Sequence, residues 1–234
     1  MPKELKGKQY KVRSFEELDL IPLLSGQGLY VMNYRQNEVL YQRKIKEVLG
    51  YSATEFDSKL INQDIFHPKQ EKAMLMLIAS AVKLGIEGDY DRTPEVRFIL
   101  LYKAKHKSGK YISLLRQTGI FETDKKGAMI SVYSLITDVS GVMDAEQVKW
   151  KLEGVKKNFE QQMKVKIKKV LSSFFTDTEL SILALLKKGF TTKQMAEKLH
   201  NSEHTISTHR RNMLRKSNCK NARELLLFAE SLGV

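Results

Sequence analysis

A series of helix-capping signals near the end of this 234-residue chain constrains its fold more than any other feature. Thr176 and Glu179 have the spacing of a capping box, in which each side chain satisfies a backbone N–H group of the other residue. Gly189 is suited to end the helix that follows. Further N-caps are expected at Thr191, with Gln194 completing a second box, at Ser202 and at Asn221. The spacing therefore predicts four short helices between residues 176 and 232.

The second and third of these helices are joined by a link of only three residues, 200–202. Each helix has one apolar stripe. The stripes consist of Met195, Ala196 and Leu199 on the second helix, and of Ile206, Met213 and Leu214 on the third. Two short helices with a tight link and one apolar face each are typical of a helix-turn-helix.

The third helix has a polar side that carries hydroxyl and guanidinium groups. These residues are Ser207, Thr208, Arg210, Arg211 and Arg215. Hydroxyls and guanidinium forks can read base edges in the major groove, and cations can bind phosphate. In an isolated helix the same residues would be an ordinary solvent-exposed face, so the neighbouring motifs decide between the two interpretations.

Taken together, this stretch resembles the LuxR-type (GerE-type) DNA-binding domain over roughly its whole length. The matching residues are Thr176, Glu179, Leu183, Gly189, K-Q-M-A-E-K-L at 193–199, Ser202, T-I-x-x-H at 205–209, Arg215, Lys216, Glu224 and Leu225. Each match is short, but all occur in the expected order and spacing.

The resemblance implies a role for each matched position. Ser207, Thr208 and Arg211 are the expected base-facing residues, although the family usually has a lysine where this chain has Ser207. The expected backbone contacts are Lys193, Thr205, Arg210 and Arg215. His209 matches a family histidine that packs around the helix, so no catalytic role is expected for it.

The region before residue 140 has a different pattern. Two β-rich runs flank the polar residues 35–37 and indicate a hairpin. A helix is expected from about Pro68 to Gly85, followed by three longer strands over 93–105, 109–121 and 128–138. We therefore predict an α+β multidomain chain: an antiparallel sheet with helices on one face, a long connector helix, and an all-α four-helix domain.

The sheet region, residues 23–140, resembles the PAS sensor domain. The residues that carry this resemblance are L-G-Y-S at 49–52, F-H-P at 66–68, K-S-G-K-Y at 107–111 and D-V-S at 138–140. It implies a space between sheet and helices, holding either a small organic ligand or a packed core that serves dimerisation. The candidate lining residues are Tyr30, Met32, Met74, Leu77, Ile78 and Leu115.

No cofactor is predicted for this region. A photoreactive flavin site of this class needs a cysteine, and Cys219, the only cysteine of the chain, lies in the C-terminal helices. Haem needs an axial ligand, and only His67 and His106 are available; we do not expect haem. We also find no metal-binding spacing, no nucleotide-binding loop and no nucleophile–base motif, so neither a metal nor a catalytic residue is predicted.

Apolar residues between Asp144 and Ser173 recur every three or four positions, which predicts one long helix over the connector, residues 141–172. The seam consists of Val148, Leu152, Val155, Phe159 and Met163. Such a narrow seam needs a partner, and a coiled coil between two copies would supply it. The alternative is a helix that packs back on its own sheet region.

The chain has a formal net charge of +13, with the excess densest after residue 140, which suits a polyanionic partner. Residues 1–22 form a charged lead-in without the apolar run of a signal peptide. No stretch is apolar enough to span a membrane, so we expect a cytoplasmic protein without a membrane partner.

These observations favour a sequence-specific transcriptional regulator. Residues 23–140 would sense a signal or dimerise, and residues 173–234 would bind an inverted repeat in double-stranded DNA as a homodimer. RNA polymerase is a further partner to consider. The alternative is a signalling adaptor that binds proteins and contacts DNA only incidentally.

Overall fold

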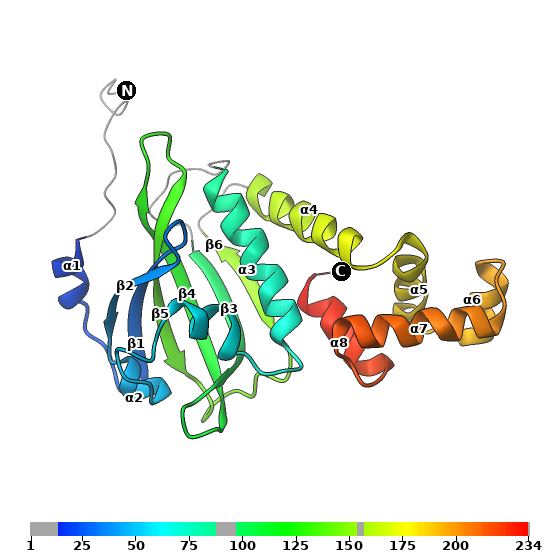
Figure 1. Ribbon diagram of the computed structural model, residues 1–234, viewed down its shortest axis with the longest axis horizontal. Helices are drawn as coiled ribbons and strands as arrows, with labels where there is room; N and C mark the ends of the chain where they lie inside the picture. The colour runs from blue at the N-terminus through cyan, green and yellow to red at the C-terminus, as the bar shows by residue number, and fades with distance from the viewer. Residues whose placement is uncertain (1–13, 88–96, 154–156, 234) are drawn as a thin grey trace.

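The apolar runs of the first two thirds of the chain form one antiparallel sheet in the computed structural model, which describes residues 14–87, 97–153 and 157–233. The strands are β1 (Gln27–Asn33), β2 (Glu38–Arg43), β3 (Arg97–Lys105), β4 (Tyr111–Thr123), β5 (Met129–Asp138) and β6 (Lys149–Glu153). Their order across the sheet is β2-β1-β5-β4-β3-β6 (Figure 1). The predicted hairpin and the three longer strands are confirmed, although residues 93–96 of the first long strand lie outside the described residues.

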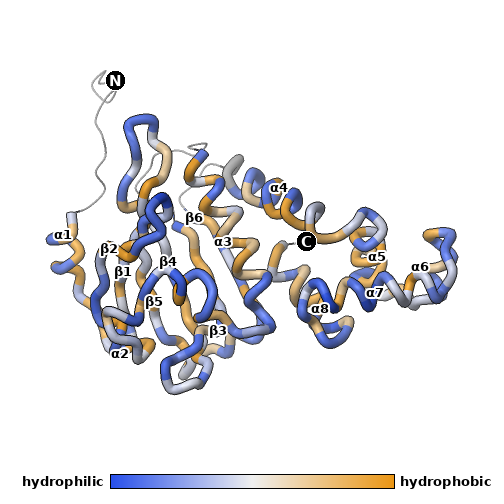
Figure 2. The backbone as a smooth tube through the Cα atoms, in the orientation of Figure 1, coloured by the Kyte–Doolittle hydropathy of each residue, from blue (hydrophilic) through white to orange (hydrophobic). Residues whose placement is uncertain are grey.

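Helices cover one face of this sheet. They are α2 (Ile45–Leu49), a π-helical turn η1 (Leu60–Asp64) and α3 (Glu71–Ile86). Met74 and Leu77 of α3 are fully buried over the strands. Figure 2 shows hydrophobic stretches along the strands and α3, with hydrophilic turns between the strands. The predicted helix therefore forms, although it begins at Glu71 rather than at Pro68.

The described part of the lead-in covers part of the opposite face of the sheet. Helix α1 (Phe15–Asp19) starts with a capping box between Ser14 and Glu17. Its Leu18 is fully buried in a cluster with Leu29 and Phe121. This small cluster shields apolar strand residues that would otherwise face solvent.

The connector differs from its prediction. Residues 149–153 form strand β6 on the β3 edge, with Leu152 opposite Phe98, and helix α4 (Lys157–Phe174) begins only afterwards. The single helix predicted from Asp144 is wrong over this segment. The reason is that residues four apart share a face of a strand as well as of a helix, so Val148 and Leu152 satisfied both patterns. Both side chains are buried in the core.

The last predicted seam residue, Met163, is also buried within one chain, together with two residues farther along α4. Met163, Ile167 and Leu171 of α4 are at most 2% exposed and belong to the same hydrophobic cluster as α3. The structure therefore shows the alternative arrangement, a helix packed on its own sheet region, and Met163 does not form a free dimer seam. Val155 lies outside the described residues, and the side chain of Phe159 is not described.

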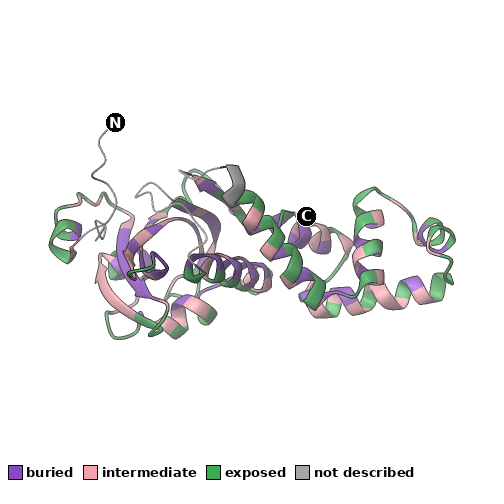
Figure 3. Cartoon of the chain, turned by 90° about the horizontal axis from the view of Figure 1, so that it is seen from above, coloured by how far each residue is buried: buried purple, intermediate pink, exposed green. Residues whose placement is uncertain are grey.

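The solvent-facing side of α4 is polar. Exposed residues run along the outer side of the helix in Figure 3. They include Lys164 and Lys168, and Lys166 pairs with Glu87 at the end of α3. A lysine-rich outer face keeps the described part of the helix solvated.

The four predicted C-terminal helices are all present. They are α5 (Asp177–Lys187), α6 (Thr192–Lys198), α7 (Glu203–Ser217) and α8 (Ala222–Ser231). Each begins at the predicted cap, with the N-cap side chain accepting a hydrogen bond from the N3 backbone N–H. Helix α6 and the start of α7 lie farthest from the sheet, whereas α8 lies beside it (Figure 1).

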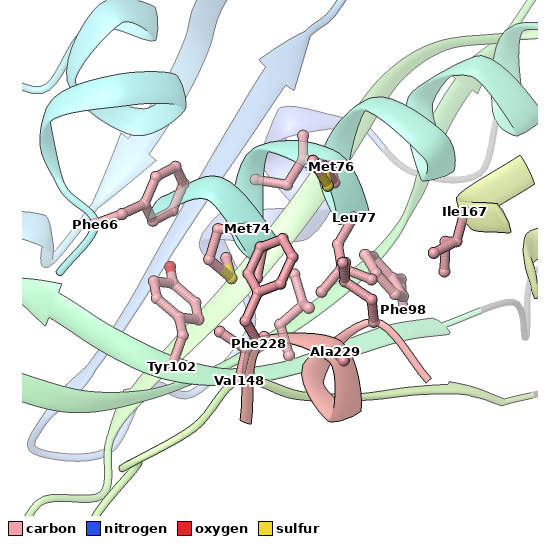
Figure 4. Packing of buried hydrophobic residues seen from close by; sticks show 14 of the residues in the cluster. Phe66, Met74, Met76, Leu77, Phe98, Tyr102, Val148, Ile167, Phe228 and Ala229 are labelled. Atoms are coloured by element: carbon pink, nitrogen blue, oxygen red, sulfur yellow. The ribbon is translucent and has the colours of Figure 1, made fainter. Parts of the chain in front are cut away.

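Helix α8 packs against the sheet region as well as against its own bundle. Phe228 and Ala229 lie beside Met74, Leu77 and Val148 (Figure 4), and all are buried in one cluster.

Polar contacts reinforce this packing. Lys69 Nζ lies 2.9 Å from Glu224 Oε1, and Asn218 Nδ2 donates to the Pro68 carbonyl over 3.4 Å. The C-terminal helices are therefore docked on the sheet region, not tethered loosely to it.

Candidate nucleic-acid interface

The α6–α7 pair is held in place by its caps and its buried stripes. Thr191 Oγ1 accepts from the Gln194 N–H at 3.3 Å, and Gln194 Oε1 accepts from the Thr191 N–H at 2.9 Å. Ser202 Oγ accepts from the Thr205 N–H at 3.0 Å and starts α7. Met195 and Ile206, from the two predicted stripes, are fully buried. The short link and the shared core fix the angle at which α7 is presented.

The outward side of α7 carries most of the predicted DNA-contacting residues. Ser207, Arg211 and Arg215 are exposed and lie four residues apart, so they share one face of the helix. Thr208 is half-buried beside them, and Lys193 is exposed on α6. The structure thus brings a hydroxyl and two guanidinium groups together on a face that no described residue covers.

Two predicted backbone contacts have intramolecular partners. Arg210 is half-buried, and its Nη1 donates to Thr192 Oγ1 at 2.5 Å, joining α7 to α6. Thr205 Oγ1 lies 2.8 Å from Ser202 Oγ. Arg210 therefore supports the angle between the helices in this structure, and its guanidinium is less free than those of Arg211 and Arg215.

A buried carboxylate ties α7 to α5. Glu179 is 2% exposed; its Oε2 accepts from the Thr176 N–H at 2.8 Å and from Lys216 Nζ at 2.6 Å. Burial alone would raise the pKa of this carboxyl, but the hydrogen bonds from Lys216 and Thr176 outweigh it and hold the pKa below its usual value. The cap of α5 and the C-terminal end of α7 thus share one ionised group.

We expect Glu179→Gln to lower the free energy of unfolding by about 1 kcal/mol at pH 7, because a charged hydrogen bond is lost beside a partly solvated lysine. Since the folded-state pKa is lowered, the contribution is complete above the unfolded pKa of about 4.3 and is lost as pH falls through the folded value. Urea unfolding at pH 7 and near pH 3 measures both. The exposed Glu197→Gln is the control, and an equal deficit at both pH values would contradict the assignment.

The sheet region contains a small cavity of about 70 Å³ between the strands and α3. Of the six predicted lining residues, only Ile78 lines it. Tyr30, Met32, Met74 and Leu77 are packed core residues elsewhere under the helices. The prediction that Leu115 lines the cavity is wrong. Leu115 alternates with buried Leu114 and Arg116 along β4, so its side chain lies on the other face of the sheet.

Arg116 was missed by the sequence reasoning. It is 2% exposed and lines the cavity. The signal was present in the strand: Leu114 and Arg116 stand two positions apart in I-S-L-L-R-Q-T, so the face that buries the leucine also buries the arginine. His67 and His106 do not line the cavity; His67 makes an edge-on ring contact with Tyr111, and His106 forms a hydrogen bond with Ser108.

Within the described residues, no group of three or more histidine, cysteine or acidic side chains could hold a metal ion. None of the helices described is long and apolar enough to cross a membrane.

Four capped helices, a tight turn between the middle pair and an exposed cationic face on the third define a helix-turn-helix domain of the DNA-binding class. Residues 173–229 match the family described as "Bacterial regulatory proteins, luxR family" (GerE). The C-terminal region is therefore a LuxR-type helix-turn-helix domain, as its motifs indicated.

Two curated relatives share this region. The HTH-type transcriptional regulators MalT of Vibrio campbellii and of Vibrio parahaemolyticus are each 38% identical over 63 residues. That stretch is 27% of this chain and 7% of each relative. The similarity thus covers the DNA-binding domain and only a small part of the relatives' length.

Solved structures resemble the chain more distantly. The Vibrio cholerae VqmA–ligand–DNA complex aligns with 94% of this chain and 89% of VqmA, at 14% identity and a TM-score of 0.36. The N-terminal domain of a Marinobacter aquaeolei diguanylate cyclase with a PAS/PAC sensor aligns with 49% of this chain and 95% of that domain, at 17% identity and a TM-score of 0.39.

Proposed function

We propose that this protein is a sequence-specific transcriptional regulator in which α7 reads the major groove. The observation that carries the proposal is the exposed face of α7, which presents Ser207, Arg211 and Arg215 at intervals of four residues. Hydroxyl and guanidinium groups on one helical face suit base edges and phosphates together. Lys193 on α6 would add a phosphate contact.

The proposal includes a homodimer on an inverted repeat. One recognition helix reads only a few base pairs, and a two-fold pair of helices about 34 Å apart would reach successive major grooves. Met163 of the predicted seam is buried within one chain, so we propose a dimer surface outside the predicted coiled coil.

In this proposal, residues 23–140 together with β6 form the sensory part, and residues 173–234 form the DNA-binding part. Helix α4 packs on α3 and leads directly into α5, and α8 packs on the sheet region. Through these two contacts, a conformational change near the sheet could alter the position of α7.

Selection from a random DNA pool at physiological salt tests the proposal. Purified full-length protein is incubated with the pool, and bound fragments are recovered and sequenced. We expect a two-fold symmetric motif whose half-sites lie about one helical turn, about 34 Å, apart. An enriched single half-site would support base reading and overturn the homodimer.

Salt-sensitive binding without any enriched sequence would contradict sequence-specific regulation for the full-length chain. Repeating the selection with residues 173–234 then separates two causes. Enrichment with this fragment alone would mean that the docked sheet region blocks the domain. No enrichment with either protein would favour the signalling adaptor.

A further inference from the structure

Arg116 places a positive charge inside the sheet region. It stands in β4 on the face that α3 covers, opposite Ile136 of β5, and is 2% exposed. The residues around it are mainly apolar or aromatic. A guanidinium remains protonated in a protein, so burial here does not remove its charge.

The structure gives this charge only weak neutral partners. Arg116 Nη1 lies 3.3 Å from the Tyr30 hydroxyl, and the guanidinium carbon lies 5.8 Å from the centre of the Tyr102 ring. Its Nε has no hydrogen-bond partner. None of the ion pairs among the described residues includes Arg116, and none of the described aspartates and glutamates of the sheet region is buried.

The surrounding phenols do not supply the missing negative charge. Burial raises the pKa of Tyr34 to about 12 and raises the pKa of Tyr102 as well, so both remain neutral at pH 7. Buried cations in proteins are normally paired with an anion, because leaving one unpaired is costly. The guanidinium is therefore incompletely matched by the protein itself.

The cavity beside Arg116 provides room for a small molecule. Its volume of about 70 Å³ exceeds the roughly 10–15 Å³ that one water molecule needs. Its walls are mainly apolar, including Ile78, Phe98 and Val132, and the polar contributions come from Tyr34, Thr118 and Arg116. An apolar chamber with a cation at one side suits a ligand with an apolar body and one anionic end.

We propose that this cavity binds a small organic carboxylate, with its carboxylate on the Arg116 guanidinium and its apolar part between α3 and the sheet. A carboxylate can accept two parallel N–H bonds from the guanidinium fork and would occupy the partnerless Nε. This proposal names the ligand class of the sensory part and so deepens the proposed function. Its binding chemistry does not depend on DNA.

The cavity lies next to the segment that joins the sheet region to the C-terminal helices. Met163 of α4 and Leu152 of β6 line the cavity together with Gly85 of α3. A ligand there would contact the helix that continues into the LuxR-type domain. The site is thus shared by the sheet and by the segment that joins it to the DNA-binding helices.

Thermal unfolding and titration calorimetry of the full-length protein test the proposal. The probes are acetate, propionate and butyrate, whose size suits a cavity of about 70 Å³, each compared with its neutral amide. We expect at least one carboxylate to bind and to raise Tm, while its amide does not. At ten times its Kd, that carboxylate should shift the unfolding equilibrium about 11-fold. If none of them binds at millimolar concentration, or if acid and amide act equally, the proposal is wrong.

Arg116→Met separates a ligand anchor from a structural residue. Without ligand, this variant should keep or exceed the wild-type Tm, because a buried charge without an anion is replaced by an apolar side chain of similar length. It should also lose the carboxylate-dependent shift. Arg97→Met, an exposed arginine of β3, is the matched control and should keep that shift.

A clear loss of Tm in Arg116→Met without ligand would assign the residue to the fold and overturn the proposal. Retained carboxylate binding in the same variant would overturn it too. Neither readout involves DNA, so a negative result leaves the DNA-binding proposal standing, and a failed DNA selection leaves this one standing.

Discussion

Arg211→Ala is expected to weaken binding to a selected DNA site by about 5- to 150-fold, which corresponds to about 1–3 kcal/mol. Arg211 is exposed on α7, and no described residue pairs with it, so its guanidinium is free to contact a base edge. A base contact discriminates between sequences. The loss on random DNA should therefore be smaller than the loss on the selected site. Fluorescence anisotropy with both DNAs at one salt concentration measures the difference.

Two variants control this experiment. Arg223→Ala removes an exposed arginine from α8, outside the helix-turn-helix pair, and should leave the discrimination intact. Lys193→Ala should weaken binding to both DNAs equally. It should also reduce the slope of log affinity against log salt concentration by about one unit, as expected for a phosphate contact. Equal losses on both DNAs in Arg211→Ala would instead make Arg211 a phosphate contact.

Phe228→Ala is expected to lower the free energy of unfolding by about 3–5 kcal/mol, the largest stability effect that we predict. The ring is 3% exposed, lies 6.1 Å from the ring of Phe174 and 6.3 Å from that of Phe175, and faces α3 (Figure 4). Its removal leaves a void where α4, α8 and α3 meet. Urea denaturation followed by circular dichroism measures the loss.

The same variant also tests the docking of α8. If α8 stabilises both regions, the wild type should unfold in one transition and Phe228→Ala should separate it into two. Val165→Ala, on the exposed side of α4, should change stability by less than about 0.5 kcal/mol. If Phe228→Ala lowers the stability of the C-terminal helices but leaves that of the sheet region unchanged, α8 stabilises only its own bundle.

The C-terminal domain was predictable because its signals are local. A capping box acts over three residues, so Thr176 with Glu179 and Thr191 with Gln194 determine where α5 and α6 begin, whatever surrounds them. Gly189 is similar: it follows the C-cap of α5 with φ at +81°, a conformation that favours glycine. The hairpin and the three long strands followed from alternation and turn residues.

The errors concern features that depend on distant partners. Leu152 became part of a strand because β3 offered a free edge, which no local pattern reveals. The prediction for Leu115 fails because the sequence indicates its strand but does not show which face of the sheet the side chain occupies. The buried charge of Arg116 is another such feature, since a sequence does not show whether a counter-ion will meet a buried arginine.

The position of α8 has a consequence for how such chains can change. A LuxR-type domain that hung on a loose linker could be exchanged for another without disturbing the rest of the protein. Here α8 belongs to one core that both regions share, with Phe228 and Ala229 packed on the sheet region and Leu225 buried in the same cluster. The two halves are therefore not interchangeable modules, and a chimaera that replaces one of them must also rebuild the surface that both share.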